Sequence, residues 1–285
     1  MTTAGAVLGA VALVLFSVAA PGATDGVMSA ELKAGTIAAF DAYVRAAESR
    51  MDDAVRRPDG FLHIDRLPPD RRREAEASMG RGDVVIDAVK NDLNGGRAID
   101  IPDGRVHHWV GAAFIRGVRM PEAVKLLQDY DRHAAIYQPA VQRSKVLARD
   151  GDRFRVFLRF YQKKVIAVTV NSEHEAEFVR VGTDRALSRI RSTRIAEVAE
   201  AGTPREHEKP VGRDGGYLWR LNTYWRFLER DGGTYIQCES ITLTRDIPFG
   251  FGWIVGPFVT SIPRESLVFT MERTREALTA RASGR

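Results

Sequence analysis

The alternation of apolar and polar residues is clearest in the segment from Tyr217 to Glu229. Apolar side chains or threonine occupy every second position, and arginine, asparagine or tyrosine occupies most positions between them. This period of two predicts a β-strand with one apolar face and one solvent-facing polar face. The Asp231-Gly232 pair that follows is typical of a two-residue type I′ turn. We therefore expect an antiparallel hairpin in which Arg230 pairs with Gly233.

The expected pairing brings large and small residues together on the apolar face of the hairpin. The facing pairs are Phe227 and Ile236, Trp225 and Cys238, and Thr223 and Ser240. Trp219 and Leu221 continue the same face toward the start of the strand. A packed core uses such size complementarity, and a ligand cavity combines aromatic walls with small and hydroxyl-bearing residues, so both interpretations stay open. The opposite face, which carries Arg226 and Glu239, is expected to point outward.

The rest of the chain also consists of short periodic runs separated by turn residues. Further strands are predicted at residues 106–115, 141–147, 154–161, 165–170, 176–181, 187–198 and 235–244. Apolar residues that recur every three to four positions predict helices at 30–55, from residue 121 onward, and at 264–280. Leu267, Met271 and Leu278 share one face of the last helix. The pattern predicts an α+β fold, with helices packed against one curved antiparallel sheet.

A second two-faced strand is predicted at residues 154–161. Phe154, Val156 and Leu158 alternate there with arginines. The arginine face is expected to be solvated, and the alternative is contact with an anionic membrane surface.

The first 24 residues carry no charged side chain, and residues 4–20 form an apolar run that ends at Pro21-Gly22. A run of about this length is typical of a signal peptide and is marginal for a membrane span. We expect residues 1–22 to be a signal peptide of an exported protein, periplasmic or secreted. An uncleaved membrane anchor and a buried core helix are the alternatives.

The composition excludes several classes of protein. The 285 residues include 42 Lys and Arg against 37 Asp and Glu, and the two signs are interleaved, so a nucleic-acid-binding surface is not expected. The single cysteine, Cys238, rules out an internal disulfide and a cysteine-based zinc site. No nucleotide-binding loop or catalytic motif is present, so we expect no cofactor, no metal and no catalytic residue.

The histidines give only weak indications of a metal or catalytic site. His107 and His108 are adjacent on a predicted strand, so one is expected to be packed and the other exposed. His63 and Asp65 would share one face if they lay on a strand. His174 is followed by a glutamate but lacks the second histidine of a zinc-binding motif.

The order of the predicted elements resembles that of the START-like superfamily, also called the Bet v 1-like or SRPBCC helix-grip proteins. The segments that carry the resemblance are residues 106–111, 121–133, 219–225, 240–248 and the glycine-rich 250–257 before the last helix. The resemblance implies a curved antiparallel sheet that grips the C-terminal helix, with an apolar cavity between them. It also implies a hydrophobic ligand, since the superfamily includes lipid-transfer domains and polyketide cyclases. We expect a helix and connector at 30–80 and the START-like domain at 81–280.

These observations predict an exported carrier of a lipid-like ligand that lies between the sheet and the last helix. The predicted ligand-binding residues are Phe154, Val156, Leu158, Trp219, Leu221, Thr223, Trp225, Phe227, Cys238, Ser240, Leu267, Met271 and Leu278. One alternative is a cyclase-like or hydrolase-like enzyme that uses the same cavity. The other is a ligand-free domain that binds a partner protein through the helix at 30–55.

Overall fold

The computed structural model describes residues 29–57, 59–91, 95–163, 167–246 and 252–284, without the side chains of 252–260. The predicted signal segment at 1–22 lies outside the described residues. None of the described helices is both long enough and apolar enough to cross a membrane.

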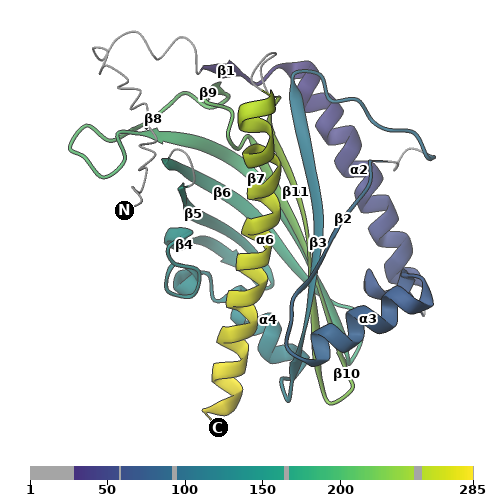
Figure 1. The fold of residues 1–285 in the computed structure, drawn as a ribbon. Coiled ribbons are helices and arrows are strands. Elements are labelled where there is room, and N and C mark those ends of the chain that lie inside the picture. Colours follow the sequence, from purple (N-terminus) through teal and green to yellow (C-terminus); the bar gives the residue numbers. More distant parts are fainter. Residues whose placement is uncertain (1–28, 58, 92–94, 164–166, 247–251, 285) are drawn as a thin grey trace, which may run out of the picture.

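A single large antiparallel sheet forms the centre of the protein (Figure 1). Its strands, in spatial order, are β2 (Val85–Ala88), β3 (Gly104–Arg116), β11 (Gly233–Arg245), β10 (Arg220–Arg230), β7 (Arg185–Ala199), β6 (Ala167–Arg180), β5 (Arg153–Lys163) and β4 (Val141–Asp150). β8 (His207–Glu208) pairs with the end of β7, and β1 (Ala30–Glu31) pairs with β9 (Arg213–Asp214) in a separate small sheet. Two register shifts interrupt the pairing of β4 with β5.

Helices cover both faces of the sheet. They are α2 (Ala34–Arg56), α3 (Pro69–Gly80), α4 (Met120–Gln128), α5 (His133–Ile136) and α6 (Gly252–Ser283), with short 3-10 turns η1 (Ile64–Arg66) and η2 (Tyr130–Arg132). The long α6 crosses one face (Figure 1), where α4 also packs, and we call this the α6 face. α2, η1 and α3 pack on the other, which we call the α2 face. The predicted α+β helix-grip architecture is confirmed.

The β10–β11 hairpin has the predicted register. Arg230 pairs with Gly233, and Trp225 pairs with Cys238. Asp231 and Gly232 have φ angles of 56° and 74°, the left-handed conformation that a type I′ turn requires at both positions. Local turn chemistry therefore fixed the pairing of the two strands.

The prediction that the second face of this hairpin is exposed was wrong. Arg226, Gln237 and Glu239 are at most 3% exposed because α2 and η1 lie over them. The apolar face of α2 itself is buried in this contact, with Phe40 and Ala47 packed against the sheet. That face is consequently not an exposed surface for a partner protein.

Several other boundaries differ from expectation. The predicted strands at 165–170 and 176–181 are, over their described residues, parts of one strand, β6 (Ala167–Arg180), rather than two. His63 and Asp65 lie in and beside the η1 turn and not on a strand. His107 and His108 do point to opposite faces, but both are buried, because helices cover both faces.

The packing of α6 on the sheet depends on Gly111 of β3. A β-carbon at this position would lie 2.8 Å from Ile86, closer than such atoms approach, and 3.0 Å from Met271, tighter than most such contacts. The absence of a side chain lets the helix lie close against the strand. Met271 and Leu278 then reach the interior of the α6 face and are fully buried.

Candidate functional site: the α6 face of the sheet

Paired residues on neighbouring strands form rows across the α6 face, and the rows differ in polarity. The row that contains Phe227 is apolar and continues through Ile236 and Ala113. The next row contains Cys238, Trp225 and Ser188. Serines, threonines and histidines become more frequent in the rows farther from the hairpin turn. The face is therefore apolar at the turn end of the hairpin and more polar at the other end.

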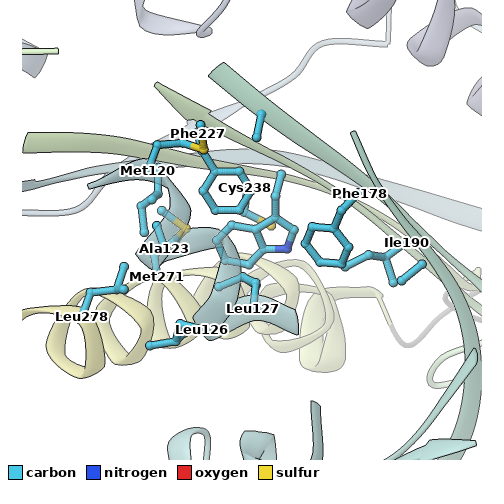
Figure 2. Packing of buried hydrophobic residues seen from close by; sticks show 14 of the residues in the cluster. Met120, Ala123, Leu126, Leu127, Phe178, Ile190, Phe227, Cys238, Met271 and Leu278 are labelled. Carbon is cyan, nitrogen blue, oxygen red and sulfur yellow. The ribbon is translucent and has the colours of Figure 1, made fainter. Parts of the chain in front are cut away.

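The apolar end is filled by helices. Leu126 and Leu127 of α4 and Met271 of α6 pack against Phe227 and Cys238 in one buried cluster (Figure 2). This cluster also contains other predicted ligand-binding residues, namely Phe154, Val156, Trp225, Leu267 and Leu278. The structure brings these residues together as a packed core, in which the rings of Trp225 and Phe227 are stacked with their centroids 6.3 Å apart.

The polar end holds three neighbouring hydroxyl groups. Thr223 pairs with Ser240 across the hairpin, and Thr242 lies two positions farther along β11 on the same face. We call these three residues the hydroxyl cluster. Leu221 pairs with Thr242 and supplies an apolar neighbour. Leu221, Thr223 and Ser240 are partly exposed, so they are the predicted ligand-binding residues of this hairpin that a ligand can reach directly.

Two predicted residues lie elsewhere. Trp219 precedes β10, and its indole N–H donates to Asp214 at 3.1 Å within the cluster under α2, on the opposite side of the sheet. The prediction that it shares the face of Trp225 was wrong, because the alternation breaks before the strand begins. Leu158 packs with Tyr137 and Phe269 in a smaller cluster that also contacts α6.

Some buried polar atoms of the α6 face lack a hydrogen-bond partner among the described residues. They include the hydroxyl groups of Thr242 and Ser188 and the Nδ1 atom of His174. Ser172 donates to the Leu158 carbonyl at 2.9 Å and accepts from His174 Nε2, which leaves Nδ1 as an acceptor. A buried polar group without a partner costs about 1–3 kcal/mol. Such groups are therefore candidate hydrogen-bond partners for a polar ligand atom.

Burial also shapes the protonation of this face. It lowers the pKa of His107 and of His174 to about 4, so both imidazoles are neutral at neutral pH. Burial raises the pKa of the Cys238 thiol far above its ordinary range, and the nearby negative charge of Glu239 raises it further. The thiol is thus protonated and is not a thiolate nucleophile.

A pocket of about 510 Å³ lies at the C-terminal end of α6. It is lined by Val118, Glu122, Lys125, Leu278, Arg281 and Gly284. Of the predicted ligand-binding residues only Leu278 borders it. This pocket is separate from the hydroxyl cluster, because the cluster lies at the end of the hairpin strands that is farther from the turn.

The α2 face contains a buried polar network that the sequence did not reveal. His108 Nε2 lies 2.6 Å from Glu239 Oε1, and His108 Nδ1 lies 2.8 Å from the Tyr43 hydroxyl. Burial lowers the pKa of His108, so a neutral ring donates to Glu239 and accepts from Tyr43. Burial opposes the charge of Glu239, but the hydrogen bond from His108 and the nearby Arg50 and Arg226 hold its pKa at about 2. The period-two pattern assigned Glu239 to this face, but the helix that covers it is about 190 residues away in the chain.

The sheet order and the long C-terminal helix decide the fold. The long C-terminal helix lies across one face of the large antiparallel sheet, which is a helix-grip arrangement. A scan of protein-family models finds no match, and a search of curated proteins finds no similar sequence. Solved structures similar to the chain include START-domain, lipid-transfer and aromatase/cyclase proteins.

Three of these structures illustrate the likeness. A STAR-related lipid transfer protein from Xanthomonas axonopodis is 14% identical, with a TM-score of 0.42 over 68% of this chain and 98% of its own. The Zhui aromatase/cyclase from Streptomyces sp. R1128 is 11% identical, with a TM-score of 0.40 over 62% and 96%. Human STARD10 is 10% identical, with a TM-score of 0.41 over 75% and 80%.

Proposed function

We propose that the protein is an exported carrier of an amphipathic ligand, which it holds on the α6 face with a polar group at the hydroxyl cluster. The observation that carries this proposal is the polarity of the three neighbouring positions Thr223, Ser240 and Thr242 on a face whose other end, at the hairpin turn, is apolar. Export rests on the charge-free apolar run at residues 4–20.

The ligand chemistry follows from the groups that would receive it. Thr242 offers a buried hydroxyl with no partner among the described residues, and Thr223 and Ser240 offer partly exposed hydroxyls. Hydroxyl groups both donate and accept, so they suit an uncharged head such as an alcohol or an amide. The neighbouring Leu221 and Ile190 suit an apolar body, whose burial contributes about 25 cal/mol per Å².

A matched pair of fluorescent probes tests the proposal. Pyrenyl-dodecanol has one terminal hydroxyl group, and dodecylpyrene has the same apolar body without it. We expect the protein to bind both probes and to bind the alcohol more tightly. Thr242→Val keeps the shape of the side chain and removes its hydroxyl group. It should weaken binding of the alcohol by about 2- to 12-fold, the equivalent of one hydrogen bond, and leave binding of the hydrocarbon unchanged.

Thr193→Val is the matched control, because Thr193 is an exposed threonine of β7. It should change the affinity for neither probe. Absence of binding by both probes to the wild-type protein would refute the carrier proposal. Equal weakening of both probes by Thr242→Val would refute the role of the hydroxyl cluster. Native mass spectrometry of the protein purified from its host should show a bound apolar molecule, and fractionation should find the protein outside the cytoplasm.

A further inference from the structure

A second pocket, of about 400 Å³, lies on the α2 side of the sheet. It is formed where the end of α2 meets η1 and is lined by Ala46, Ser49, Arg50, Asp53, Ala54, Arg57 and Arg66. Three of these residues are arginines. The only carboxylate of the lining, Asp53, forms an ion pair with Arg56, which is not part of the pocket. The described lining is thus strongly positive.

Arg66 is a pocket arginine whose Nε atom is buried and has no partner among the described residues. Its side chain is partly buried, and its guanidinium group has neither an ion pair nor a hydrogen bond among the described residues. The Nε atom of Arg50 is also buried without a partner among them. Arg50 does contact Glu239 through its terminal nitrogen. Buried guanidinium N–H groups are ordinarily paired, so these orphan donors need an explanation.

A fourth guanidinium, that of Arg226, lies close to Arg50 and Arg66. Arg226 is 3% exposed and donates to the backbone carbonyls of Phe61 and Met51, and neither of these partners carries a charge. Burial lowers the pKa of Arg226 to about 10 despite the attraction of Glu239, and Arg66 and Arg50 repel its charge further. Burial and the charge of Arg50 also lower the pKa of Arg66.

The neighbouring acidic groups do not balance this charge. Asp52 pairs with Arg189, and Asp65 pairs with Arg230. Burial lowers the pKa of the nearby His63, so that ring adds no charge at neutral pH. Arg50, Arg57 and Arg66 of the lining and the neighbouring Arg226 are therefore four positive charges against the single carboxylate of Glu239. This leaves an excess of three positive charges around the pocket.

We propose that this pocket binds a phosphate dianion, either as inorganic phosphate or as a phosphate monoester. A dianion offsets most of this excess of positive charge, and its oxygens accept hydrogen bonds from arginine N–H groups that lack partners. Guanidinium groups suit this chemistry because their fixed donors pair with two oxygens of one phosphate. The site is independent of the hydroxyl cluster, because the two lie on opposite faces of the sheet.

Isothermal titration calorimetry at about pH 8, where phosphate is mainly dianionic, tests the proposal directly. Inorganic phosphate and glycerol 3-phosphate should bind and should raise the melting temperature, and acetate should bind much more weakly. Arg66→Gln should weaken phosphate binding by about tenfold or more, as expected for loss of a charged hydrogen bond. The same variant should melt no earlier than the wild type in phosphate-free buffer, because it removes a charge that Arg50 repels.

Arg45→Gln is the control, because Arg45 is an exposed arginine of α2 outside the pocket. It removes the same charge from the chain and should leave phosphate affinity unchanged. Arg57→Gln at the pocket rim provides a second loss-of-binding variant. Absence of phosphate binding to the wild type, equal affinity for acetate, or equal losses in Arg66→Gln and Arg45→Gln would overturn the proposal.

Vesicles of phosphatidylcholine with and without phosphatidic acid identify the source of the phosphate. Binding to phosphatidic acid that Arg66→Gln abolishes would assign the pocket to a lipid head group. Binding of the soluble anions alone would assign it to a free phosphate compound. Vesicle binding that is insensitive to Arg66→Gln, without binding of soluble phosphate, would overturn the pocket as the site.

Discussion

Buried histidines should make the stability of this protein sensitive to mild acid. Burial lowers the pKa of His107, His133 and His174 from 6.5 to about 4 in the folded protein. In the unfolded chain these side chains titrate near 6.5, so the unfolded state binds more protons between the two values. Their stabilising contribution is therefore complete above pH 6.5 and is lost as the pH falls toward 4.

The size of the loss follows from these values. At pH 5 an unfolded histidine is almost fully protonated, and a folded one with a pKa of about 4 is mostly neutral. The difference corresponds to about 2 kcal/mol for each of the three side chains, and about 6 kcal/mol together. The free energy of unfolding of a typical domain is only about 5–15 kcal/mol. Lowering the pH from 7 to 5 should thus remove a large part of the stability.

Urea denaturation followed by tryptophan fluorescence at pH 7 and pH 5 measures this loss. His174→Gln replaces the imidazole with an uncharged side chain, so it should reduce the difference between the two pH values by about 2 kcal/mol. His207→Gln is the control, because His207 is exposed, and it should leave the difference unchanged. Equal stability of the wild-type protein at both pH values would show that the histidines are not buried as described.

Two substitutions test the packing of the two faces. Trp225→Ala should lower the free energy of unfolding by about 3–5 kcal/mol, because Trp225 is 3% exposed in the packed core. A loss below about 1 kcal/mol in urea denaturation would contradict a filled interior at this position. Glu239→Gln should lower the free energy of unfolding by about 3–5 kcal/mol, because it leaves Arg50 and His108 without their charged partner. A melting temperature like that of the wild type would refute the buried network.

The hairpin shows what local sequence chemistry is able to predict. The Asp231-Gly232 turn and the period-two alternation predicted every pairing from Arg230 to Thr223 correctly, because the residues that decide them are neighbours in the chain. The last helix was also predicted, although it extends from Gly252 to Ser283 and is thus longer than expected. Trp219 shows where the reasoning stops, since alternation carries no information beyond the end of the strand.

The environment of the second sheet face was not predictable in the same way. A row with Arg226, Gln237 and Glu239 has the composition of a solvated surface, and only the distant α2 and η1 make it an interior. Gln237 accepts a hydrogen bond from the backbone of His63, about 170 residues earlier in the chain. Local pattern does not encode such long-range partners, so the arginine pocket became visible only in the folded structure.

β4 is an outer strand of the large sheet, with η2 and α5 packed beside part of it, and its composition opposes pairing with another chain. Exposed Arg143, Lys145 and Arg149 lie along the strand, and two register shifts interrupt its pairing with β5. Edge strands with free backbone groups are templates for aggregation, which cationic side chains and bulges oppose. Two copies joined edge to edge through β4 would bring these cations together. The charged border thus favours the dispersed protein over fibrous growth at high concentration.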